Sequence, residues 1–132
     1  LTLERRTQPG EPVSDVTAEL QAILDRLSAA DSSFRAELEA TFDRDPFEIV
    51  ADAAIVQTLD SVVGEHLGPQ RPHTGATFWT DAAILAGAGI ETVLFGPTGA
   101  GLHSAEEWVD LQSVYDMADI LAKTAAAYCG EV

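Results

Sequence analysis

The chain has 132 residues, which suits one domain or parts of two larger ones. Its 22 acidic and 7 basic side chains leave a formal net charge of −15. A polyanion gains no affinity by releasing counterions from phosphates, which argues against nucleic acid and anionic membranes as partners. Hydrophobic residues make up 46% of the chain and the single Cys129 excludes an internal disulfide, so we expect a folded, cytoplasmic protein.

The first part of the chain, residues 1–45, is predicted to form a β-α-β unit. Apolar and polar residues alternate over 1–7, as in a strand. Ser14 or Asp15 is expected to cap the helix that follows, whose apolar residues recur at helical spacing over about four turns. Alternating residues over 34–42 then predict a strand with one charged, solvated face. The abrupt opening strand indicates a piece of a longer chain or, equally, a mature edge strand.

The second part of the chain, residues 46–132, is predicted to combine helices with one buried strand. One strand cannot satisfy its backbone groups without neighbours, which again indicates a piece of a larger sheet. The expected elements are a helix over 55–67 ended by Gly68-Pro69, a polar loop over 70–77, a short helix over 80–88, a strand over 91–95, a glycine loop over 96–101 and a helix over 110–128.

The candidate metal ligands are three histidines. A zinc site needs three or four converging protein ligands, and the chain has no His-x-His motif and no paired cysteines. His66 and His73 are interpreted as ordinary histidines of a helix rim and a polar loop. His103 follows the predicted buried strand by one glycine loop, where α/β proteins place their sites, and precedes the acidic pair Glu106-Glu107. Spacing alone leaves a ligand role and a plain surface role open for His103.

Nucleotide-binding and carboxylate-binding sites have weaker support in the sequence. The glycine loop over 96–101 begins like a phosphate-binding loop, but Leu102-His103 stands where that motif requires Lys and Ser or Thr. A nucleotide-binding function is therefore the weakest option. The aromatic pair Phe78-Trp79 precedes a predicted helix start, where it either helps to hold a carboxylate or forms a hydrophobic staple.

Two stretches, taken together, resemble one known family. The C-terminal stretch runs from Thr80-Asp81 through the strand and glycine loop to His103-Ser-Ala-Glu-Glu107-Trp-Val, and the N-terminal stretch is Glu4-Arg-Arg6-Thr-Gln-Pro-Gly-Glu11. They are similar to the C-terminal motif and to the lid strand of the di-zinc amidohydrolases. This family includes acetylornithine deacetylase, succinyl-diaminopimelate desuccinylase, aminoacylase and carboxypeptidase G. Both stretches occur in the family's order, so the resemblance covers nearly the whole chain.

The resemblance implies roles for particular residues. His103 would be a ligand of one zinc ion, with cobalt or manganese as possible replacements, and Glu107 would be the acid behind it. Arg6 would bind the acyl or carboxylate group of the substrate, a task suited to a planar guanidinium. Thr80 and Asp81 would line the substrate pocket.

The resemblance also implies an α/β fold that is part of a larger two-domain enzyme. Residues 1–45 would close the lid or dimerisation domain, and residues 46–132 would form the C-terminal part of the catalytic domain. The family's His-x-Asp motif, bridging Asp and Glu-Glu pair have no counterpart here. The chain would therefore contribute one zinc ligand and be inactive alone. The intact homodimer would remove acyl groups from N-acyl amino acids or short peptides, and its lid would join the subunits.

Two departures from the family pattern leave the substrate open. The usual lid Asp is Glu4, and the small residues common before Thr-Asp are replaced by Phe78-Trp79. An alternative from a different class is a non-catalytic interaction module that self-associates through the predicted strand over 34–42, because an exposed strand edge favours pairing.

Overall fold

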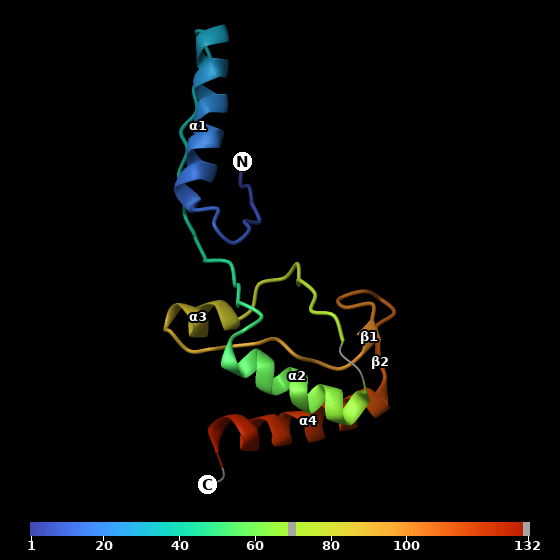
Figure 1. Cartoon of the computed structure of the whole chain (residues 1–132). Helices are drawn as coiled ribbons and strands as arrows, with labels where there is room; N and C mark the ends of the chain where they lie inside the picture. Colours follow the sequence, from blue (N-terminus) through green and yellow to red (C-terminus); the bar gives the residue numbers. More distant parts are fainter. Residues whose placement is uncertain (69–70, 131–132) are drawn as a thin grey trace. The chain divides into compact units, whose positions relative to one another are not determined.

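Four helices and one short antiparallel sheet form the regular structure of residues 1–68 and 71–130, which the computed structural model describes (Figure 1). Pro69 and Gln70, part of the predicted helix end and polar loop, lie outside these residues. Mixing helices with a small sheet agrees with the predicted α/β class. The elements are α1 (Val13–Ala30), α2 (Ala54–Leu67), α3 (Ala82–Gly87), β1 (Gly99–Ala100), β2 (Trp108–Val109) and α4 (Leu111–Cys129).

The chain divides into two units. The first unit is Leu1–Glu48 and the second begins at Ile49. The expected domain boundary between residues 45 and 46, and the assignment of the two parts to a lid and a catalytic domain, stay predictions. Among residues 1–68 and 71–130, no helix is both long enough and apolar enough to cross a bilayer.

Helix α1 of the first unit confirms the helix expected from apolar spacing, but its predicted cap is wrong. The helix begins at Val13, with Pro12 at the N-cap position, and neither Ser14 nor Asp15 caps it. The reason lies in Pro12, which starts the first turn by accepting a hydrogen bond from the Asp15 amide at 3.0 Å. Its ring fixes φ at −75°, so the chain enters the helix without a side-chain cap.

The two strands predicted in the first unit are not formed. Residues 1–7 and 34–42 are irregular, because no described segment offers either of them a hydrogen-bonded neighbour. The alternation of 34–42 is not visible in burial either, because Phe34 and Leu38 are half-buried but the rest of the same predicted face, Ala36, Ala40 and Phe42, is exposed. These residues therefore have neither the backbone hydrogen bonds nor the buried face that the strand prediction implies.

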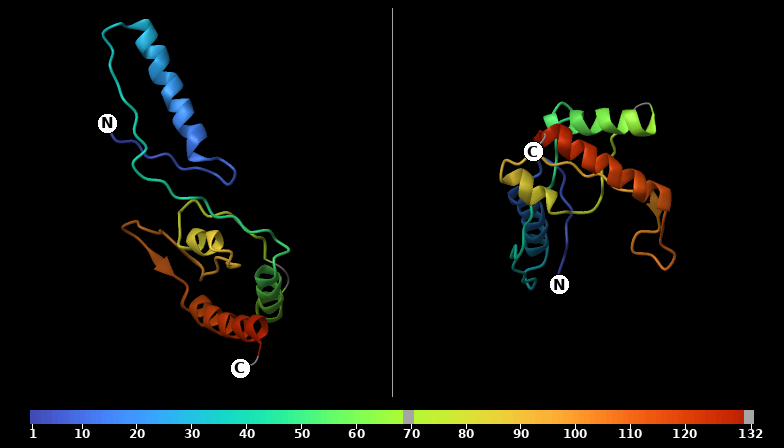
Figure 2. Two further views of the ribbon diagram at one scale, coloured as in Figure 1. Left: turned by 90° about the vertical axis from the view of Figure 1, so that its left-hand side faces the viewer. Right: turned by 90° about the horizontal axis from the view of Figure 1, so that it is seen from below.

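In the second unit, α2 and α4 pack against each other (Figure 2). Ile120 of α4 has no solvent-exposed surface and packs among apolar side chains of α2. The apolar spacing predicts the buried face of α2. The prediction is wrong for α4, where Ile120 and Thr124 are buried and most of the expected stripe is exposed, including Leu111, Leu121 and Tyr128. The buried cluster consists of Leu59, Val62, Val63 and Ile120, with Val93 and Phe95 packed against it.

Polar contacts at both ends of the pair show that α2 and α4 are antiparallel. Glu91 accepts a hydrogen bond at 3.1 Å from the Ile55 amide, in the first turn of α2, and one at 3.0 Å from the Tyr128 hydroxyl, near the end of α4. At the other end, His66 Nε2 lies 3.2 Å from Asp116 Oδ1. The bond to Glu91 raises the pKa of Tyr128, because the carboxylate favours the protonated phenol.

His66 has two partners on α4. Lys123 Nζ lies 3.4 Å from its Nδ1, opposite the contact with Asp116. Because an ammonium group can only donate, Nδ1 accepts and Nε2 carries the proton that faces Asp116. Hydrogen bonds from Gln112 and His66 lower the pKa of Asp116. His66 is thus an ordinary helix-packing histidine, as the sequence indicates.

The buried strand expected over 91–95 is extended but belongs to no sheet among the described residues. Val93 and Phe95 pack against the α2–α4 core, whereas Leu94 is 44% exposed. The expectation that both faces are covered is therefore wrong for these residues. A continuous apolar run is typical of a strand that is covered on both faces. Here α2 and α4 cover only the face that carries Val93 and Phe95.

Candidate functional site

A β-hairpin carries His103. β1 and β2 pair antiparallel, with Gly99 opposite Val109 and Ala100 opposite Trp108. The sequence predicts only a glycine loop here. Gly99 is required by the close approach of the strands, because a Cβ at this position would lie 2.4 Å from the Trp108 carbonyl oxygen. The glycines of this segment therefore serve a tight hairpin.

The hairpin is tied to the start of α4. Asp110 is the N-cap predicted for this helix, and its carboxylate accepts a hydrogen bond from the Ser113 amide at 2.8 Å. The Asp110 amide donates to the Thr98 carbonyl at 2.8 Å, and the Thr98 amide donates to Ser113 Oγ at 2.9 Å. These bonds join the hairpin base to the longest helix of the second unit.

His103 lies in the exposed loop between β1 and β2, in the left-handed region at φ 62°. Within the described residues its imidazole makes no hydrogen bond and no ion pair, and Glu106 and Glu107 are also exposed. The expectation that His103 lies in a cleft beside carboxylates is therefore not met by this part of the chain. Its role as a ligand, and that of Glu107 behind it, stay predictions.

The chemistry of His103 nevertheless fits a metal ligand. An imidazole without a partner keeps a lone pair for coordination, and imidazole is a preferred ligand of zinc. Among residues 1–68 and 71–130, however, no group of three or more His, Cys, Asp or Glu side chains could hold an ion. The described residues thus do not assemble a complete metal site by themselves, and the role of His103 in one stays a prediction.

The predicted substrate-pocket residues lie at the start of α3. Thr80 is half-buried and its Oγ1 accepts a hydrogen bond from the Ala82 amide at 3.4 Å. Asp81 is the exposed N-cap residue, but its side chain makes no capping bond. Phe78 is 52% exposed and Trp79 is 39% exposed. This segment presents two aromatic rings, a hydroxyl and a carboxylate, and its role in substrate binding stays a prediction.

Arg6 belongs to the first unit. Its guanidinium Nε lies 2.7 Å from Glu4 Oε1, and both side chains are more than two-thirds exposed. An exposed ion pair of this kind contributes little stability, so it leaves the guanidinium accessible to an anionic ligand. Arg5, the residue before Arg6, forms an ion pair with Glu11.

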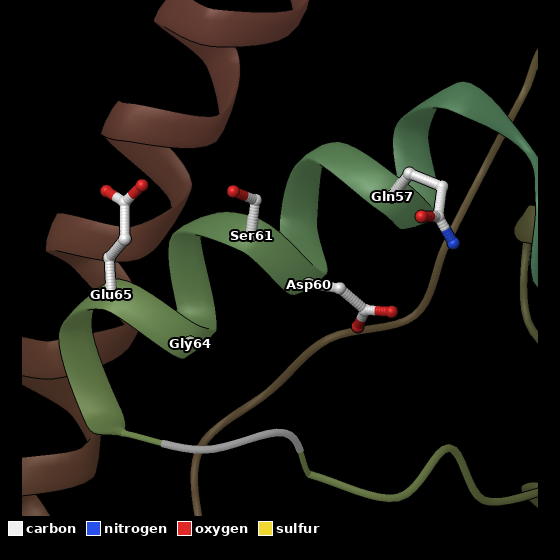
Figure 3. A pocket seen from close by; sticks show the side chains of 5 residues that line it. All are labelled: Gln57, Asp60, Ser61, Gly64 and Glu65. Carbon is white, nitrogen blue, oxygen red and sulfur yellow. The ribbon is translucent and has the colours of Figure 1, made fainter.

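One polar contact of the second unit escaped sequence reasoning. His73 Nε2 lies 2.9 Å from both carboxylate oxygens of Asp60 on α2. The spacing of residues along the sequence gives no indication that Asp60 and His73 are in contact. Asp60 also borders a shallow depression lined only by α2, and Figure 3 shows its side chains spread around the helix without converging. The lining residues are Gln57, Asp60, Ser61, Gly64 and Glu65.

Gly101 offers a test of the hairpin geometry. It lies at φ 78°, and a Cβ there would approach the Glu106 carbonyl oxygen to 1.9 Å. Gly101→Ala is expected to destabilise the hairpin by about 2 kcal/mol, from the positive φ and the clash. Faster hydrogen exchange at the Ser104 amide, which donates to the Gly101 carbonyl at 2.8 Å, would measure it.

The matched control is Gly96→Ala, because a Cβ at Gly96 meets no atom within 4 Å and its φ is not positive. This variant should change exchange at the Ser104 amide by less than about 0.5 kcal/mol. Equal exchange rates in the two variants would contradict the hairpin described above.

Comparison with known proteins assigns the chain to a family. Residues 5–127 match the model of peptidase family M20/M25/M40. The match covers most of the chain, including both units and the His103 hairpin. The protein belongs to peptidase family M20/M25/M40, whose members are generally metal-dependent.

One curated relative extends this result. The chain is 28% identical over 129 residues to the acetylornithine deacetylase of Myxococcus xanthus, an alignment that covers 97% of the chain and 32% of that protein. The chain therefore spans about a third of the length of the curated relative. No solved structure matches the chain significantly.

Proposed function

We propose that this chain is part of a metal-dependent amidohydrolase that removes the acyl group from N-acyl amino acids or short peptides. The observation that carries the proposal is the family match over residues 5–127, which includes a histidine whose imidazole has no protein partner among the described residues. The similarity to a protein named as a deacetylase supports an acyl group as the part removed.

His103 would hold one ion, with zinc as the first candidate and cobalt or manganese as alternatives. When bound, such an ion polarises the amide carbonyl and lowers the pKa of a water molecule. Glu107 would accept a hydrogen bond from the second ring nitrogen of His103 and so fix the orientation of the ring. In the present exposed loop no described contact joins the two side chains.

Three residues named by the resemblance are proposed to bind substrate. The guanidinium of Arg6 would bind a carboxylate with two parallel hydrogen bonds. Thr80 and Asp81 would line the pocket. The exposed rings of Phe78 and Trp79 lie beside them in the chain and offer an apolar wall.

The exposed apolar side chains of the hairpin support the proposal that further polypeptide lies around His103. Several apolar side chains on and next to the hairpin are at least half exposed, which is unusual for a surface that faces water alone. We infer that other polypeptide of the same protein covers them and brings the remaining metal donors. The side chains are Leu102, Trp108, Val109, Leu111 and Tyr115.

The test is an activity assay of the intact protein on N-acyl amino acids that differ in acyl group. Hydrolysis should stop when a chelator removes the metal and return when zinc, cobalt or manganese is added back. Residues 1–132 expressed alone should show no hydrolysis, because zinc catalysis needs about three protein ligands. Hydrolysis that is unchanged in the metal-free intact protein would refute the proposal, as would metal-dependent turnover by the isolated chain.

A homodimer is also part of the proposal. Residues 34–42 of the first unit belong to no sheet among the described residues, and their alternating sequence would suit pairing with a strand of another subunit. The interface would lie on the first unit, away in sequence from the His103 hairpin.

A further inference from the structure

The loop that carries His103 is held in an uncommon backbone conformation. His103 lies at φ 62°, and it is the single residue other than glycine with positive φ among those described. Such a conformation costs a residue with a side chain about 1–2 kcal/mol relative to ordinary backbone. It persists only where the surrounding structure holds it.

The next residue, Ser104, supplies contacts that hold this loop closed. Its amide donates to the Gly101 carbonyl at 2.8 Å. Its hydroxyl oxygen lies 2.8 Å from the same carbonyl oxygen and 2.9 Å from the Glu106 carbonyl oxygen. The hydroxyl proton is shared between two carbonyl groups on opposite sides of His103, so one side chain ties both arms of the loop together.

The shape of the loop leaves room for this hydroxyl and little else. A Cβ on Gly101 would come within 2.8 Å of Ser104 Oγ and 1.9 Å of the Glu106 carbonyl oxygen. The two arms of the loop therefore approach each other as closely as a residue without a side chain allows. Ser104 spans the gap at the point of closest approach.

We propose that Ser104 is a positioning residue that holds the His103 backbone in its left-handed conformation, so that the imidazole is presented to the metal without further ordering. This inference rests on the proposed role of His103 as a ligand. Ser104 touches neither metal nor substrate. Ordering one backbone residue at the moment of binding lowers affinity about ten-fold, which is the gain that preorganisation avoids.

The test compares zinc affinity among variants of the intact protein. Ser104→Ala removes the bridging hydroxyl, Ser104→Thr keeps it, and Ser61→Ala removes an exposed hydroxyl of α2 as the matched control. Competition with a chromogenic chelator should show about ten-fold weaker zinc binding for Ser104→Ala. The other two variants should bind as the unmodified protein does, and the melting temperature of all three metal-free proteins should be unchanged.

The outcomes separate this inference from the proposed function. If His103→Ala loses zinc while Ser104→Ala binds it normally, the positioning role is wrong and the metal site stands. If Ser104→Thr weakens binding as much as Ser104→Ala, the hydroxyl is not responsible and the inference fails. A lowered melting temperature of the metal-free Ser104→Ala protein would show a general structural role instead. Normal zinc binding by His103→Ala would overturn the proposed function itself.

Discussion

His103→Ala in the intact protein is expected to lower kcat/KM roughly a hundred-fold to ten-thousand-fold and to reduce the zinc content. The proposed ion stabilises charge in the transition state by several kcal/mol, and each 1.4 kcal/mol corresponds to about a factor of ten in rate. His103 is the one candidate ligand that the family resemblance assigns to this chain. Its imidazole has no competing partner among the described residues, so its loss removes a metal donor without breaking a contact of the hairpin.

His73→Ala is the matched control for this experiment. His73 is also an exposed histidine of a loop in the second unit, but its ring lies against Asp60 at 2.9 Å. The control should keep its zinc and its rate. Metal analysis and kinetics on both variants give the comparison. Wild-type turnover and zinc content in His103→Ala would contradict the assignment, as would equal losses in the two variants.

Ile120→Ala is expected to destabilise the second unit by about 3 kcal/mol. Ile120 is fully buried between α4 and α2. Truncation removes apolar contacts with Leu59, Val62 and Val63 and leaves a cavity that close-packed neighbours fill only in part. Hydrogen exchange of the amides of α2 and α4 in the intact protein measures the change, since these amides exchange through opening of the unit.

Leu121→Ala provides the control on the same helix. Leu121 is the next residue of α4 and is 44% exposed, so its truncation removes less buried surface. The expected loss is below about 1 kcal/mol. Similar exchange rates in the two variants would show that the α2–α4 contact is not the core of this unit. In that case the antiparallel pair described above would be wrong.

Sequence patterns predicted the helices well because a helix satisfies its own backbone hydrogen bonds. The apolar spacing of α1, α2 and α4 is a property of each segment alone, and so is the Asp110 cap at the start of α4. The predicted start of α1 is two or three residues too late, since Pro12 begins the helix in place of a cap at Ser14 or Asp15.

The strands could not be predicted in the same way. Residues 1–7, 34–42 and 91–95 have strand patterns, yet none belongs to a sheet among the described residues. A strand is completed by hydrogen bonds to a neighbour that its own sequence does not specify. In the small sheet that does form, β1 lies in the segment interpreted from sequence as a glycine loop, and the sequence analysis assigns no element to the segment of β2.

The candidate site also combines residues that the sequence indicates with contacts that only the structure shows. Resemblance singles out Arg6, Thr80, Asp81, His103 and Glu107, but within residues 1–68 and 71–130 no three or more His, Cys, Asp or Glu side chains come together as a metal-binding group. The Ser104 bridge had no sequence signal, because a serine next to a histidine is common. Only the folded loop showed that its hydroxyl reaches carbonyl oxygens on both sides of His103.

The sequence by itself determined the helices, the acidic character and the family resemblance, all of which depend on residue type and short-range spacing. Tertiary structure alone decided which polar groups meet: Glu91 with the start of α2 and the end of α4, Asp60 with His73, and Ser104 with the two arms of its loop. The physical reason is the separation along the sequence over which each feature is determined. Helical periodicity repeats within a few residues, whereas these hydrogen bonds depend on how the backbone returns on itself.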